Sequence, residues 1–242
     1  MRLPTFPFHR RGSIRAATWI EVLAVVVALL FLAGLMVPVF TRSPRRASRI
    51  KCVNNLKNLG LALRIFATDT EGKFPWMIPD AKGGSQEDLT DESRIWRHFQ
   101  VLSYELSTPK SLQCPTDTNI PTTGNPDWVF RPTRTNDINV RQLSHNDHVS
   151  YFLTTGFAEQ ANNPILAGDR NLTRNGQAIR GQLRPATNDV FGFTKPGHHE
   201  GGGNLLFGDG SVQQVSSSEA AQTFSAGLAP IGTNPPPTIL IP

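Results

Sequence analysis

Two histidine-containing segments carry residue types that could bind a metal ion. His145 and His148 stand three residues apart, and the run 198–200 reads His-His-Glu. Imidazole nitrogens together with a carboxylate are common zinc ligands in catalytic sites. However, neither segment has the periodicity of a helix, and the chain contains no His-Glu-x-x-His motif. We therefore expect no catalytic zinc, and we expect His199 to hydrogen-bond within or beside a hairpin, with Asp209 as a candidate partner.

Other motifs that carry chemistry are missing from the sequence. The glycine run 201–203 is not followed by Gly-Lys-Ser/Thr and leads into an apolar stretch typical of a strand, so it does not predict a phosphate-binding loop. We interpret it as a flexible connector. The chain also has no Gly-x-Ser-x-Gly segment, the turn that presents a nucleophilic serine in many hydrolases. These observations favour a protein that is not an enzyme.

The two cysteines, Cys52 and Cys114, form a pair whose state depends on the compartment. In an oxidising compartment they could form a disulfide that joins segments far apart in the chain, whereas in the cytosol they would remain thiols. The sequence leaves both states open.

The charge of the chain is divided unevenly along its length. The net charge is +5, but residues 1–51 hold nine Lys or Arg and a single acid, Glu21. The remainder has 15 basic and 18 acidic residues, a net charge of −3. Because nucleic-acid-binding domains concentrate basic charge on the folded body, we expect no nucleic-acid partner.

Residues 17–40 form the longest apolar stretch, interrupted only by Thr18 and Glu21. A stretch of 24 residues is long enough to cross a bilayer as a helix, which needs roughly 20 residues. Four arginines and no acid precede it, as in signal peptides and membrane anchors. A carboxylate in such a span costs about 2.5–3.5 kcal/mol at the bilayer centre and usually marks a function. Near the interface it would cost little.

Residues 16–23, AATWIEVL, resemble the class III signal of type IV pilins and type II secretion pseudopilins. That signal has a small residue before the cleavage site and a glutamate fifth in the mature chain. The resemblance implies that a prepilin peptidase cuts between Ala16 and Ala17 and methylates the new amino group of Ala17. In a filament, the carboxylate of Glu21 would then neutralise the Ala17 ammonium of a neighbouring subunit. Removing one partner of such a buried pair costs roughly 3–5 kcal/mol.

The body of the chain resembles one pseudopilin subfamily at both of its ends. Residues 52–75 resemble the subfamily's asparagine-rich helix, and His199 is followed after nine residues by Asp209 and Gly210, as in its processing-associated motif. Residues 112–117 and 165–171 extend the likeness. Major pseudopilins bind calcium, so the resemblance makes Asp169, Asp189 and Asp209 candidate calcium ligands. The chain has no EF-hand spacing, and we expect no cofactor.

The remaining sequence predicts an α+β head with antiparallel strands. Apolar residues recur every three or four positions over 49–68, which predicts a helix with one buried face: Ile50, Val53, Leu56, Gly60, Leu63 and Ala67. Pro44 predicts a break near 41–44. A further helix is predicted within 92–106, and strands at 149–152 and 165–167.

Two hairpins and a helix start are predicted in the last third of the chain. Asn175-Gly176 and the Asp209-Gly210 pair within 204–215 are turn signals. The serines at 216–218 predict a helix N-cap. The proline-rich tail, 226–242, ends in apolar residues 239–241 that could add to a sheet edge.

The sequence therefore predicts a pilin-like subunit with a leader at 1–16, a transmembrane helix at 17–40, a basic linker and amphipathic helix at 41–68, a head at 69–225 and a tail at 226–242. Its partners would be a prepilin peptidase, other pseudopilins or copies of itself, and an inner-membrane assembly platform. The head would lie outside the cytoplasmic membrane and the N-terminus inside. Two alternatives remain, a membrane-anchored enzyme or binding protein with catalytic histidines and a pilin for adhesion or DNA uptake.

Overall fold

The computed structural model describes residues 18–40, 44–106, 108–120, 127–129, 140–156, 163–186, 188–195, 198–228 and 237–242. It divides into two compact units, Met1–Ser43 and Pro44–Pro242. The helix predicted at 49–68, within the linker segment 41–68, therefore lies in the second unit together with the head. The break was predicted near 41–44, and residues 41–43 of that stretch fall outside the described residues.

The first unit contains one helix, α1 (Trp19–Phe40). Its side chains are described as far as Ala33, and apart from Glu21 all of those in the helix are apolar. Within the part of the chain whose side chains are described, no helix combines the length and the hydropathy that crossing a membrane requires.

The second unit begins with α2 (Pro44–Asp69), which is longer than the predicted helix by five residues at its start. Pro44 occupies the first helical position, where the missing N–H costs nothing because that group has no partner within the helix. The buried face differs from the predicted one at its beginning, since Ile50 is 60% exposed whereas Cys52 is fully buried. From Leu56 onward the predicted spacing is correct, and Leu56, Leu63 and Ala67 are fully buried.

The core of the second unit is a six-stranded antiparallel sheet, which confirms the α+β class and the antiparallel pairing. The strands follow the order β10-β9-β4-β3-β11-β7. Their bounds are β3 (Tyr151–Thr155), β4 (Ile165–Asp169), β7 (Gly181–Leu183), β9 (Gly202–Phe207), β10 (Val212–Ser216) and β11 (Thr238–Ile241). The predicted strand 149–152 overlaps β3, and the predicted strand 165–167 lies within β4.

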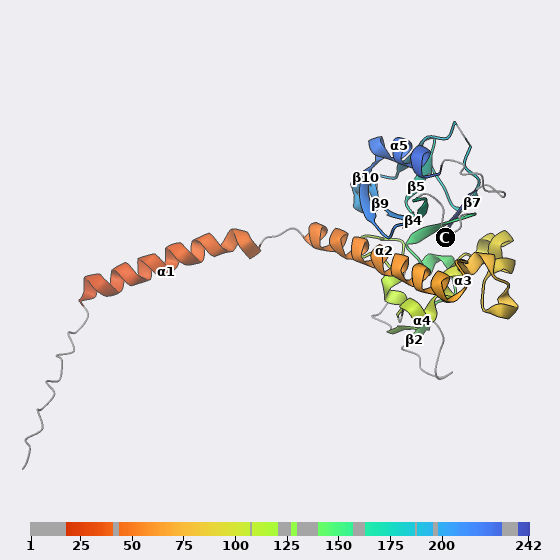
Figure 1. Cartoon of the computed structure of the whole chain (residues 1–242). Coiled ribbons are helices and arrows are strands. Elements are labelled where there is room, and N and C mark those ends of the chain that lie inside the picture. The colour runs from red at the N-terminus through yellow and green to blue at the C-terminus, as the bar shows by residue number, and fades with distance from the viewer. Residues whose placement is uncertain are drawn as a thin grey trace, which may run out of the picture. The chain divides into compact units, whose positions relative to one another are not determined.

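Side chains on both faces of this sheet are buried, because helices or strands cover each face. Leu206 packs into the cluster that includes the buried side of α2, whereas the neighbouring Leu205 packs into a second cluster. The second cluster contains Phe224 of α5 (Ser217–Gly227) and Phe191 of β8 (Phe191–Phe193). Figure 1 shows α2 and α5 on opposite sides of the strands. Burial on both faces explains why the first three residues of β3 and of β4 are all large or apolar, without a polar alternation.

A second sheet, in the order β6-β5-β8, is also antiparallel. It contains β5 (Leu172–Arg174) and β6 (Gln177–Ala178), joined by the predicted turn. Asn175 and Gly176 both have positive φ angles, 52° and 81°, as a tight hairpin requires. One further pair, β1 (Asp127–Val129) and β2 (Val140–Gln142), is parallel and was not predicted.

Residues 75–112 form short helical segments in place of the single predicted helix. Those within the predicted range are η4 (Glu92–Arg94), α3 (Trp96–Gln100) and α4 (Ser103–Leu106). The others are η1 (Pro75–Met77), η2 (Asp80–Lys82), η3 (Gln86–Thr90) and η5 (Pro109–Leu112). Two more single turns lie at the histidine segments: η6 (Asn146–His148), which His145 precedes, and η7 (His198–Glu200).

The end of the chain is an internal strand, which corrects the prediction of a strand at a sheet edge. β11 pairs with β3 on one side and with β7 on the other. Ile239 and Leu240 are fully buried, so the apolar run gains cover on both faces of the sheet. The prolines before it, 229–236, lie outside the described residues.

Candidate functional site

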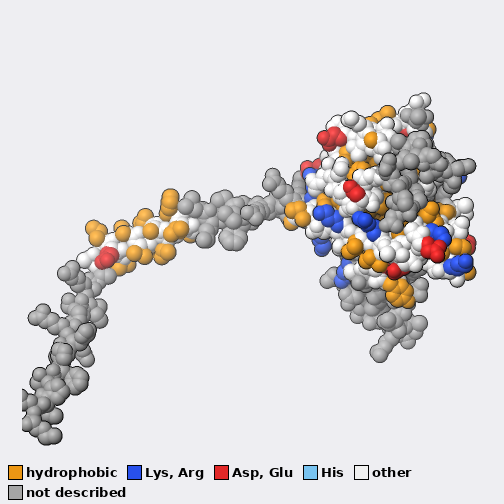
Figure 2. Space-filling view, viewed as in Figure 1, with side chains coloured by type: hydrophobic (Ala, Val, Ile, Leu, Met, Phe, Trp, Pro, Cys, Tyr) orange, Lys and Arg blue, Asp and Glu red, His pale blue; other side chains and the backbone are white. Residues whose placement is uncertain are grey.

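The predicted processing and assembly residues lie at the start of the first unit. Ala16 and Ala17 fall outside the described residues. Glu21 stands in the first turn of α1, with its backbone N–H bonded to the carbonyl of Thr18 at 2.9 Å. Around it the helix presents large apolar side chains, with Trp19 83% and Ile20 76% exposed. Figure 2 shows hydrophobic side chains along the visible face of this part of α1.

Cys52 and Cys114 form a disulfide, one of the two states that the sequence left open. Their Cα atoms are 5.0 Å apart, and the bond joins α2 to the segment after η5. Both residues are buried, Cys52 completely. The bond thereby fixes the helix to the body of the head across 62 positions of sequence.

His199 points into the buried space beside this disulfide. Its Nε2 atom lies 3.6 Å from Cys114 Sγ, 3.3 Å from Asp169 Oδ2 and 3.0 Å from Asn204 Nδ2. The predicted hydrogen bond to the hairpin is confirmed, because Asn204 belongs to β9. The candidate partner Asp209 was wrong, and the acidic neighbour of His199 is Asp169 of β4. His199 has a φ of 51°, an uncommon conformation for a residue other than glycine.

A buried ion pair lies close to the same disulfide. Arg170 Nε is 2.8 Å from Asp117 Oδ2, and both side chains are at most 3% exposed. The hydroxyl of Ser150 donates to the same carboxylate at 2.9 Å and accepts from the N–H of Cys114 at 2.9 Å. A buried charge is tolerated only when it is paired and hydrogen-bonded, and the Asp117 carboxylate meets both conditions through Arg170 and Ser150.

Tyr151 is enclosed among these charges. Burial raises the pKa of its phenol well above the ordinary value, and the nearby carboxylate of Asp169 adds to the rise. The phenol therefore stays neutral and fills the core between the sheet and α2. Together the network joins residues from 52–75, 112–117, 165–171 and 199–210, the four segments singled out in the sequence.

Asp209 and Gly210 occupy the turn between β9 and β10. The carboxylate of Asp209 accepts from the N–H of Ser211 at 2.8 Å, and Gly210 has a φ of 82°. Hydrogen bonds from Ser211 hold the pKa of Asp209 below its usual value. Asn163 exchanges two further hydrogen bonds with Asp209, at 2.9 and 3.2 Å. The motif therefore places a turn at one end of β9 and a buried histidine at the other.

The three candidate calcium ligands lie in three separate networks. Asp169 is buried beside His199, and Asp209 caps the β9–β10 turn. Asp189 binds Arg174 at 2.6 Å; burial alone would raise its pKa, but the hydrogen bond from Ala186 and the Arg174 charge lower it. Among the described residues, the one group of His, Cys, Asp or Glu with converging ligand atoms is Cys52, Cys114 and His199.

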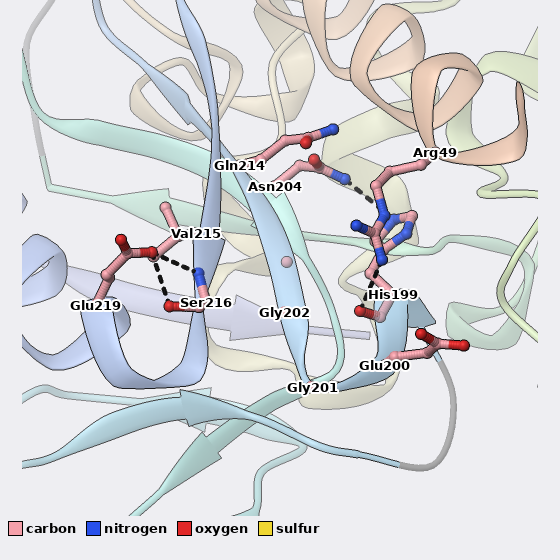
Figure 3. A pocket seen from close by; sticks show the side chains of 11 residues that line it. Arg49, His199, Glu200, Gly201, Gly202, Asn204, Gln214, Val215, Ser216 and Glu219 are labelled. Carbon is pink, nitrogen blue, oxygen red and sulfur yellow. Dashed lines mark hydrogen bonds between the residues drawn. The ribbon is translucent and has the colours of Figure 1, made fainter. Parts of the chain in front are cut away.

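An open pocket of about 400 Å³ lies beside His199. Figure 3 shows Arg49 of α2 at one side and Glu219 of α5 at the other, with the strand at Gly202 between them. Arg49 donates to the carbonyl of His199 at 3.1 Å. Glu219 accepts from the N–H and the hydroxyl of Ser216, in a capping box that starts α5 as predicted. These contacts are structural, and the Ser216 hydroxyl has Glu219 and Ser218 as neighbours instead of a histidine base.

The glycine run beside the pocket is part of the sheet, so the prediction of a flexible connector was wrong. Gly202 and Gly203 begin β9. A Cβ atom at Gly203 would come within 2.2 Å of the Phe193 ring. Glycine is needed here for the close approach of β8 and β9. A strand rich in glycine has no apolar alternation, so the sequence carried no signal for it.

Several residues of the buried network were not predicted as site residues, namely Asn204, Arg170, Asp117 and Ser150. The available signal was a run of polar residues, Asp169-Arg170-Asn171, at the end of the apolar stretch 165–168. Such a run indicates polar side chains close to the core. Comparison with known proteins gives no match to any protein family, curated protein or solved structure.

Proposed function

We propose that this chain is a pseudopilin-like structural subunit of a type II secretion or type IV pilus-like filament. A prepilin peptidase would remove residues 1–16, and the apolar segment 17–40 would hold the subunit in the cytoplasmic membrane before assembly. The head would lie on the extracytoplasmic side. An inner-membrane assembly platform would then extract subunits into a filament made of this chain or of related pseudopilins.

The observation that carries the proposal is the combination of the processing signal with an exposed apolar helix in a unit of its own. Large side chains of α1 are exposed, among them Leu30 at 68% and Phe31 at 69%. A surface of this kind needs cover from lipid or from other subunits. In the membrane it would contact lipid, and in a filament it would contact the same helix of neighbouring copies.

Glu21 supplies the specificity of that packing in the proposed filament. Its position in the first turn of α1 would place it, in the filament, next to the amino group that cleavage creates at Ala17 of a neighbouring copy. An ion pair between copies would satisfy both charges in an apolar core. It would also fix how far each subunit is displaced along its neighbour.

The buried position of His199 supports a structural head more than a catalytic one. His199 is 8% exposed, and its ring faces Asp169, Asn204 and the disulfide. The net charge of −3 on the body gives no support to a pilin that binds DNA.

The proposal is tested by replacing Glu21 with Gln in the full chain, co-expressed with an assembly machine. The variant should still be processed and remain in the membrane fraction. Cross-linked multimers should fall at least about 100-fold, because the Ala17 ammonium would lose its buried partner. Glu71→Gln, at an exposed acid of the head, is the control and should assemble normally. Normal assembly of Glu21→Gln would contradict the proposal.

A further inference from the structure

We propose that the reduced form of this protein binds one zinc ion through Cys52, Cys114 and His199. One ligand atom from each residue lies within 4.8 Å of the others, and all three residues are buried. Two thiolates and an imidazole are among the ligand sets that bind Zn²⁺ most strongly in proteins. This site does not depend on the proposed filament function, since it concerns the head alone.

The distances already suit a tetrahedral zinc ion at one edge of the site. With Zn–S of about 2.3 Å and Zn–N of about 2.1 Å, tetrahedral geometry separates sulfur from nitrogen by about 3.6 Å. Cys114 Sγ and His199 Nε2 are 3.6 Å apart. Once the disulfide is reduced, the two sulfurs can separate to the distance of about 3.8 Å that zinc requires. The change involves rotation of two side chains whose backbones are already adjacent.

Residues around the three ligands supply the supporting contacts that zinc sites need. Thr116 Oγ1 lies 2.9 Å from Cys114 Sγ and 3.9 Å from Cys52 Sγ, so its hydroxyl can donate to a thiolate. Asp169 Oδ2, 3.3 Å from His199 Nε2, is a carboxylate oxygen beside the imidazole and a candidate for the fourth position. Contacts of this kind orient metal ligands and raise their affinity.

The pocket shown in Figure 3 lies next to the site, since His199 helps to line it. The backbone carbonyl of His199 is held by Arg49 at 3.1 Å, and the residue keeps its left-handed conformation. The imidazole is therefore positioned before any metal arrives. Such preorganisation favours binding without rearrangement of the backbone.

The switch between the two states is a balanced reaction. A dithiol reductant transfers two electrons and two protons to the Cys52–Cys114 bond and becomes a disulfide itself. The S–S bond breaks and two thiols form. Zinc binding then releases both thiol protons, because the thiolates are the ligands. A disulfide oxidant reverses these steps: the Cys52–Cys114 bond forms again and the zinc ion is released. The protein therefore holds either the disulfide or the zinc ion.

The experiment compares zinc uptake by the reduced and oxidised full chain in detergent, after circular dichroism has shown that both are folded. Zn²⁺ is added, free metal is removed, and bound zinc is counted per chain. We expect one zinc in the reduced protein and none in the oxidised protein. Cys52→Ser/Cys114→Ser should bind none in either condition. A folded, reduced wild-type protein that takes up no zinc would overturn the proposal.

The role of the imidazole is tested with His199→Asn, since asparagine tolerates a left-handed backbone better than most residues. The zinc affinity of this reduced variant should fall by at least about 100-fold. His145→Ala, at an exposed histidine, is the matched control and should bind zinc as the wild type does. Unchanged affinity in His199→Asn would contradict the assignment.

A spectroscopic measurement on the wild type covers the case in which a variant fails to fold. X-ray absorption of the zinc-loaded, reduced protein should show two sulfur ligands and at least one imidazole nitrogen. Substitution with Co²⁺ should produce thiolate-to-cobalt charge-transfer bands. A metal coordinated by oxygen and nitrogen alone would show that the cysteines are not ligands, and the proposal would be wrong.

Discussion

Asp169 and Asn204 are joined through a single carboxylate oxygen. The backbone N–H and the side-chain amide of Asn204 both donate to Asp169 Oδ2, each at 2.8 Å. Because Asp169 ends β4 and Asn204 lies near the start of β9, this oxygen connects two neighbouring strands where the sheet meets His199. All three residues are buried, so the connection is protected from water.

Asp169→Ala should destabilise the head by about 3 kcal/mol. The change leaves two buried N–H donors of Asn204 without their acceptor, each at about 1–3 kcal/mol in other proteins. Urea unfolding followed by circular dichroism measures the loss. The control is Asp147→Ala, at an exposed acid, which should shift the unfolding free energy by less than about 0.5 kcal/mol. A similar small shift for Asp169→Ala would show that the network contributes little.

The double variant Cys52→Ser/Cys114→Ser should lower the unfolding free energy by about 4 kcal/mol, because the bond closes a long loop of the unfolded chain. The comparison is made by denaturant unfolding of oxidised wild type and variant with a chelator present. Adding reductant should destabilise the wild type and leave the variant unchanged. If reductant had no effect on wild type with confirmed free thiols, the bond would not be a source of stability.

The stability of the head should fall with decreasing pH because of His98. Burial lowers the pKa of His98 to about 4, against an ordinary value of 6.5. The unfolded chain therefore binds a proton between pH 6.5 and 4 that the folded head resists. The contribution is complete above pH 6.5 and is lost as pH falls toward 4, by roughly 3 kcal/mol. His98→Gln should flatten this part of the stability profile, and a profile identical to wild type would contradict the assignment.

The sequence predicted the local elements of the head where a strong local signal existed. The spacing of Leu56 and Leu63 predicted α2, the Asn175-Gly176 pair predicted the β5–β6 turn, and the serine run predicted the start of α5. Each signal depends on residues close together in the chain, so it needs no knowledge of the tertiary fold.

The buried network could not be predicted, because its members are far apart in sequence. Nothing local shows that Asp169 will face His199, or that Asp117 will face Arg170. The strand β11 was assigned to an edge for the same reason, since its partners β3 and β7 are defined only by the folded sheet. These positions depend on contacts between segments that are distant in sequence, and the periodicity within one segment does not predict such contacts.

The most direct test of the account is the intact mass of the protein extracted from membranes of cells that contain a prepilin peptidase, with the N-terminal peptide sequenced. Cleavage and methylation by the peptidase predict a chain that begins at N-methylated Ala17 and lacks the 16-residue leader. A chain that still begins at Met1 would contradict it, and Glu21 would then have no assembly role.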